Sequence, residues 1–174
     1  MPRNLRVAAA LGRPDLKAGA SGEHRSFYRP HPGFKSWQPS DDPAEIRDEA
    51  LVWACRNGRV EVLDLVGGDI DAEVAATPPL LAASGHGRTE CVRWLLDHGA
   101  DPQRTAAQWP GATALHSAAW FDRRDTVELL VERGARCDVR DLQHDGTPGD
   151  WAAHHGNREV AEWLDRGSRG DVVK

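Results

Sequence analysis

One eight-residue pattern recurs five times in this chain and constrains its fold more than any other feature. In most copies the pattern opens on leucine, has two small residues three and four positions later, and ends on glycine. Successive copies begin 46, 29, 35 and 34 residues apart, at 5–12, 51–58, 80–87, 115–122 and 149–156. A recurrence near 33 residues is typical of stacked helical units, in which no unit buries its apolar face alone.

A second apolar run follows each of the last four copies. Apolar residues at i, i+1, i+3 and i+4, with charges between them, form one buried face of a helix. Glycines then stand where a helix would end in a left-handed cap, as at Gly68, Gly99 and Gly134. Each unit is therefore predicted to be a helix, a tight turn, a second helix, a glycine stop and an extended finger. The second runs are 62–66, 91–96, 126–131 and 160–164.

At these residues the chain resembles the ankyrin repeat family. The best match is 111–119 (GATALHSAA) followed by 126–135 (TVELLVERGA), and 145–148 (DGTP) opens the fifth unit in the same style. The resemblance implies an all-α fold, an ankyrin-type helical repeat solenoid with short β-hairpin or finger loops. It also implies a single array over 1–168 with about five units, the first of them degenerate. We expect these units near 1–20, 44–72, 76–103, 111–140 and 145–166.

The long first step indicates an insertion at 21–40. Its three prolines and two glycines exclude a long helix, and its four aromatic residues, Tyr28 among them, are too many for a disordered linker. We predict a packed loop, which either covers the apolar edge of the first two units or folds over a groove as a lid. Residues 169–174 are expected to be a flexible tail.

Composition excludes several kinds of protein. The chain has 22 basic and 27 acidic residues, a net charge of −5, so neither nucleic acid nor a membrane is expected as a partner. No apolar run is long enough for a secretory signal or a membrane span. We therefore expect a cytoplasmic monomer that stands alone, without an appended catalytic or DNA-binding domain. Cys55, Cys91 and Cys137 form no Cys-x-x-Cys pair, so no zinc site or cofactor is predicted, and Cys55 and Cys91 are expected to be buried thiols.

The resemblance also implies which residues face the solvent. In ankyrin arrays the two positions before each turn point into a concave groove, beside the finger tips. Large apolar side chains at such positions are unfavourable unless they cover something, so this surface is the predicted binding site. Its residues here are Arg56, Asn57, His86, Trp120, Phe121, His154 and His155, joined by Trp109 on the adjacent finger and Tyr28 of the insertion.

The remaining aromatic residues and His116 are expected to be structural. Trp94 and Trp163 fall in second-helix core positions, and Trp53 and Trp151 are predicted to be partly buried walls. By the resemblance, the imidazole of His116 bridges backbone groups between units, since buried polar groups need partners.

Two functional hypotheses follow. The first, which we favour, is a non-enzymatic module that binds a protein partner in its concave groove, with Trp109, Trp120 and Phe121 as anchors inside a polar rim. The second is a small-molecule site, with the 21–40 loop closing over the groove. In that case Asp150, His154 and His155 could move protons in a cyclisation, isomerisation or elimination, because Asp150 and His154 lie four residues apart on one helix face.

Overall fold

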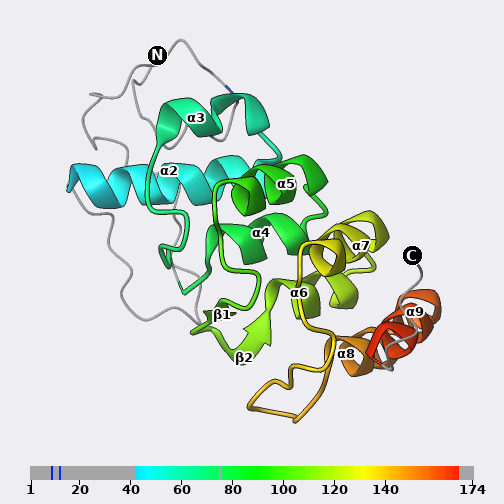
Figure 1. Ribbon diagram of the computed structural model, residues 1–174. Helices are drawn as coiled ribbons and strands as arrows, with labels where there is room; N and C mark the ends of the chain where they lie inside the picture. The colour runs from blue at the N-terminus through cyan, green and yellow to red at the C-terminus, as the bar shows by residue number, and fades with distance from the viewer. Residues whose placement is uncertain (1–8, 10–11, 13–41, 75, 169–174) are drawn as a thin grey trace.

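Stacked helix pairs form the described part of the chain. The computed structural model describes residues 9, 12, 42–74 and 76–168. Four helix pairs follow one another in order across this part of the chain (Figure 1). The expected unit near 1–20, apart from Ala9 and Gly12, lies outside the described residues, as do the insertion at 21–40 and the tail at 169–174.

In each pair a first helix leads through a tight turn into a second helix. The first helices are α2 (Pro43–Asn57), α4 (Pro79–Gly85), α6 (Ala114–Trp120) and α8 (Pro148–His154). The second helices are α3 (Leu63–Val66), which follows a 3₁₀ turn at Val60–Val62, α5 (Thr89–Asp97), α7 (Arg124–Glu132) and α9 (Arg158–Ser168). Helix α2 packs on α4, α4 on α6 and α6 on α8, while α5 packs on α7. The first helices therefore form one row and the second helices another.

The helix starts and turns follow from local sequence. Asp42 caps α2 by accepting a hydrogen bond from the Ala44 N–H at 2.8 Å, and a proline occupies the first turn. The turn after α4 needs glycine at position 87, because its φ is +64° and the Arg123 side chain of the next unit lies over it. The corresponding turn after α6 has Asp122 at φ +56°, a conformation that aspartate tolerates better than most residues.

Fingers project from the row of first helices. The best formed is a hairpin of β1 (Thr105–Ala106) and β2 (Trp109–Thr113), which pair antiparallel. A single bridge between Val74 and Thr77 marks the preceding finger. The predicted solenoid with short β-hairpin fingers is thus confirmed. None of the helices in the described part of the chain is both long enough and apolar enough to cross a bilayer.

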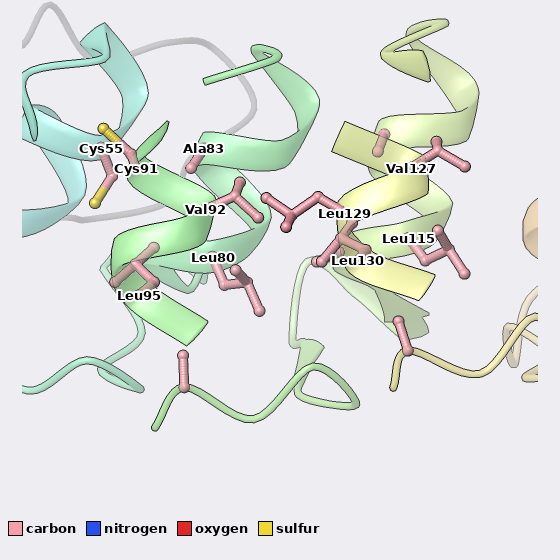
Figure 2. Close-up of a cluster of buried hydrophobic side chains, with 14 of the residues drawn as sticks. Cys55, Leu80, Ala83, Cys91, Val92, Leu95, Leu115, Val127, Leu129 and Leu130 are labelled. Carbon is pink, nitrogen blue, oxygen red and sulfur yellow. The ribbon is translucent and has the colours of Figure 1, made fainter. Parts of the chain in front are cut away.

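One apolar core runs through all four helix pairs. It extends from Ala9 to Leu164 and includes residues from both rows of helices. Figure 2 shows part of it, where Leu129 of α7 extends toward Val92 of α5. The same view shows Cys55 beside Cys91, and both are free, buried thiols, as expected. Trp94 and Trp163 are only partly buried, and they pack against the outside of this core rather than within it.

Ser84 is a polar defect in this core. Its side chain is fully buried and its hydroxyl oxygen has no hydrogen-bond partner. A buried hydroxyl without a partner costs free energy that an apolar side chain does not. We expect Ser84→Ala to raise the free energy of unfolding by up to about 1 kcal/mol, measured by urea denaturation. A loss of stability would show that the hydroxyl has a partner in solution.

Candidate functional site

A cavity of about 520 Å³ lies where α6, α8 and two fingers meet. Four aromatic rings line it: Trp109 from β2, Trp120 from the last position of α6, Phe121 from the cap that follows, and Trp151 from α8. Of these, Trp109, Trp120 and Phe121 are predicted groove residues, and the structure brings all three to one cavity. The polar groups beside them are Ser117, Gln143, His144, Asp150 and His154.

His116 fixes α6 against the finger that borders the cavity. The Thr113 N–H donates to Nδ1 at 3.1 Å, so the imidazole proton lies on Nε2, which donates to the Gly146 carbonyl at 3.2 Å. The side chain is fully buried. Burial lowers the pKa of His116, so the ring is neutral when it bridges the two units. The expected role of His116 between units is confirmed.

Asp141 organises the finger itself. Its Oδ1 accepts hydrogen bonds from the N–H groups of Gln143 and His144, and its Oδ2 accepts from the Gly146 N–H and the Trp151 indole, all at 2.8–2.9 Å. Burial would raise the pKa of Asp141, but these four donors outweigh it and lower the pKa to about 2. The carboxylate therefore holds the finger backbone and the Trp151 ring in one arrangement.

Sequence reasoning missed this group of residues. Asp141, Gln143 and His144 were assigned no role, and Trp151 was expected only as a wall. The signal that could have revealed Asp141 is its place ahead of the Gly146-Thr147-Pro148 segment, since aspartate in a turn accepts hydrogen bonds from N–H groups two and three residues later.

Trp120 is held in a cluster of rings. The Trp151 ring meets it nearly edge-on, with the two centroids 5.4 Å apart. The rings of His155, the residue that caps α8, and of His154, the last residue of α8, lie 4.1 Å and 6.0 Å away. Such contacts stabilise a pair beyond simple area burial. Trp120 is consequently half-buried and oriented before any partner arrives.

Phe121 is the exposed member of the cavity. Its side chain is 45% exposed, and its ring lies over Gly85 of the neighbouring unit. A Cβ at position 85 would stand only 2.5 Å from the Ser117 hydroxyl and 3.4 Å from Phe121 Cδ2. Glycine at this point of α4 thus allows α6 to approach closely.

Asp150 acts as a helix cap. Its Oδ2 accepts hydrogen bonds from the Thr147 N–H at 2.9 Å and the Thr147 hydroxyl at 2.8 Å. These two bonds hold the pKa of Asp150 below its usual value. Asp150 and His154 both line the cavity, as their spacing indicates, but the hydrogen bonds of Asp150 go to Thr147. The acid–base role suggested for Asp150, His154 and His155 stays a prediction.

The N-terminal groove residues lie away from this cavity. Arg56 Nε donates to His86 Nε2 at 3.3 Å, and His86 Nδ1 donates to the Ala82 carbonyl at 2.9 Å. Burial, together with the positive charge of the nearby arginines, lowers the pKa of His86 and keeps the ring neutral. Asn57 turns back to its own helix, where Nδ2 donates to the Trp53 carbonyl at 2.8 Å. Tyr28 lies outside the described residues.

No group of three histidine, cysteine, aspartate or glutamate side chains capable of holding a metal ion occurs in the described part of the chain.

The repeat geometry agrees with a family model of known proteins. A model described as ankyrin repeats, in three copies, matches residues 51–141, slightly more than half of the chain. The chain belongs to the ankyrin repeat family. Ankyrin repeats generally act as protein–protein interaction modules.

Several known proteins match this chain over a small part of their own length. Ankyrin repeat and KH domain-containing protein mask-1 of Caenorhabditis elegans is 29% identical over 73% of this chain and 6% of its own length. Diacylglycerol kinase zeta of Rattus norvegicus is 32% identical over 91% of this chain and 17% of its own. Ankyrin repeat and KH domain-containing protein 1 of Homo sapiens is 40% identical, with coverages of 54% and 4%. The chain thus spans less than a fifth of each of these three relatives.

The ankyrin arrangement continues past the residues that the family model matches. At the turn before α7, Arg123 Nε donates to the Gly85 carbonyl at the end of α4, at 3.3 Å. At the turn before α9, Asn157 Nδ2 likewise donates to the Ala119 and Trp120 carbonyls at the end of α6, both at 2.9 Å. Both contacts supply donors to carbonyls that a helix end leaves without partners. Helices α8 and α9 therefore stack on the preceding helix pair in the same way, and α8 supplies Asp150, Trp151 and His154 to the cavity.

Proposed function

We propose that this ankyrin array is a non-enzymatic binding module that holds a protein partner in its concave groove, with the aromatic cavity as the centre of the contact. The observation that supports this most is Phe121, a large apolar side chain that is 45% exposed at the mouth of a cavity lined by three tryptophans. Aromatic anchors surrounded by polar side chains carry most of the free energy in protein interfaces.

Rigidity supports the same proposal. His116 and Asp141 link the finger to α6 and α8, and Trp120 is fixed against Trp151. A surface that is ordered before binding loses little side-chain entropy when a partner docks. The cavity is thus suited to bind a partner without rearrangement of the array.

A binding experiment with matched variants tests the proposal. Affinity capture from a lysate of the native host identifies the partner, and the Kd of the purified pair is then measured for wild type and Phe121→Ala. We expect Phe121→Ala to weaken binding by about 2 kcal/mol, or ~30-fold in Kd. The fold should be unaffected because the Phe121 side chain is not part of the buried core.

Leu65→Ala provides the control. Leu65 is also a large exposed apolar residue, at 59% exposure, but it belongs to α3 in the second-helix row. Its removal should leave the Kd unchanged. Equal losses for both variants, or wild-type affinity for Phe121→Ala, would place the partner elsewhere on the array.

The cavity itself supports a second candidate, a small-molecule site. Its volume of about 520 Å³ falls in the range of ligand pockets, about 300–1,000 Å³. A thermal-shift screen of small metabolites distinguishes the two candidates, since a specific ligand would raise the melting temperature of wild type but not of a Trp120→Ala variant. The predicted lid at 21–40 lies outside the described residues.

A further inference from the structure

The cavity gathers most of the aromatic rings in the described part of the chain. This part holds six tryptophans and Phe121, and four of these seven rings line the cavity. The face of an indole ring carries negative electrostatic potential, and tryptophan is the best of the aromatic side chains at attracting a cation. A cavity with three indoles therefore favours a positive group over a negative one.

The charged groups around the rings also favour a positively charged ligand. Asp150 is the carboxylate among the described residues that line the cavity, and neither lysine nor arginine is found among them. Both hydrogen bonds to the Asp150 carboxylate from Thr147 use Oδ2, which leaves Oδ1 for a ligand. The lining thus carries a net negative charge.

A second carboxylate, that of Asp141, makes one of these rings more electron-rich. Asp141 Oδ2 accepts the Trp151 indole N–H at 2.9 Å. A hydrogen bond to a charged acceptor polarises its donor, so electron density shifts into the Trp151 ring. Arg140, the residue before Asp141, pairs with Asp145, and its positive charge also acts on Asp150, but its side chain does not line the cavity. The cavity remains electron-rich.

We propose that this cavity binds the positively charged end of a lysine or arginine side chain presented by the protein partner. Asp150 is the counter-ion, and the indoles of Trp109, Trp120 and Trp151 surround the alkyl stem and the charged head. The inference rests on the proposed function, because the side chain belongs to the partner bound in the groove. The net charge of −5 on the whole chain also attracts a basic partner.

Alkyl fragments test this specificity without a known partner. The full chain is titrated, slightly above neutral pH, with n-butylguanidinium and n-butylammonium, and with pentanamide and pentanoate as neutral and anionic analogues of similar length. Ligand-observed NMR gives each Kd. We expect millimolar binding of a cation, at least about threefold tighter than pentanamide, and weaker binding still for pentanoate. The better of the two cations indicates whether the partner presents arginine or lysine.

Two substitutions locate the bound cation. Asp150→Asn keeps an oxygen for the Thr147 cap and removes the charge, so cation affinity should fall by up to about fivefold while that of pentanamide stays constant. Asp138→Asn makes the same change in net charge at an exposed finger position that adjoins Asp150 in a neighbouring pocket but does not line the aromatic cavity, so its effect should be much smaller. Trp120→Phe should raise the Kd of the cation by about threefold.

The outcomes separate this inference from the proposed function. If pentanamide or pentanoate binds as tightly as the cations, or if the cations do not bind, the charge specificity is wrong. Equal effects of Asp138→Asn and Asp150→Asn would also overturn it. The proposed function fails separately, when Phe121→Ala retains the partner at wild-type affinity.

Discussion

Replacing Asp141 with alanine is expected to lower the free energy of unfolding by about 3 kcal/mol. The carboxylate is 3% exposed and accepts hydrogen bonds from Gln143, His144, Gly146 and Trp151. Its removal leaves the Gly146 N–H buried without an acceptor and releases the Trp151 indole. Urea denaturation followed by circular dichroism measures the loss of stability, and binding of the proposed partner should weaken with it.

Asp141→Asn separates charge from shape. An amide has one acceptor oxygen where the carboxylate has two, so two of the four donors would face an NH₂ group, and we expect a loss of about 2 kcal/mol. The pH dependence gives a second readout. The pKa of Asp141 is about 2 in the folded protein and near 3.9 in an unfolded chain. Its stabilising contribution is therefore full above about pH 4 and is lost as the pH falls toward 2. The free energy of unfolding of Asp141→Asn should lack this pH dependence.

Asp138→Ala is the matched control for this prediction. Asp138 lies on the same finger, but it is exposed and paired with Arg136 at the surface. Surface ion pairs contribute little to stability, so the variant should unfold like the wild type. If Asp141→Ala were no less stable than Asp138→Ala, the finger would not depend on the buried carboxylate.

Leu129→Ala should destabilise the array by about 3 kcal/mol. Leu129 is 3% exposed, lies in the continuous core, and extends from α7 toward Val92 of the preceding unit (Figure 2). Truncation removes apolar burial and leaves a cavity between two layers that cannot collapse fully. The shift in urea midpoint at constant slope measures the effect.

Leu142→Ala is the corresponding surface control, since Leu142 is 79% exposed at the finger tip. Surface truncations usually change stability by less than about 0.5 kcal/mol. A small effect of Leu129→Ala, comparable to that of Leu142→Ala, would mean that adjacent helix pairs do not share one core.

Much of the fold could be predicted from sequence because each unit carries its own local signals. The small residues, the second apolar run and the glycine stops recur in register, so the helix pairs from α2/α3 to α8/α9 fall where the pattern predicts them. Trp120 and Phe121 were predicted to share a surface with His154 because they occupy equivalent places before the turns, and the structure brings them to one cavity.

The rest depends on contacts between units that the repeat pattern does not contain. The finger at 136–147 takes its path from tertiary bonds such as Leu142 N–H to the Pro110 carbonyl, at 2.9 Å. The turn around Asp141 therefore has a local signal in the sequence, but the hydrogen bond from Asp141 to the Trp151 indole does not. Likewise, equivalent positions do not guarantee equivalent surroundings. Arg56 and His86 occupy groove positions but bond to each other rather than line the aromatic cavity.

The most direct test of the account is to follow the tryptophan indole N–H resonances of the array as the captured partner is added. Trp109, Trp120 and Trp151 line the cavity, whereas Trp94 and Trp163 lie on the second helices. We predict shifts or broadening for the first three resonances and little change for the other two. Perturbation of Trp94 or Trp163, with the three cavity resonances unmoved, would contradict the groove as the binding site.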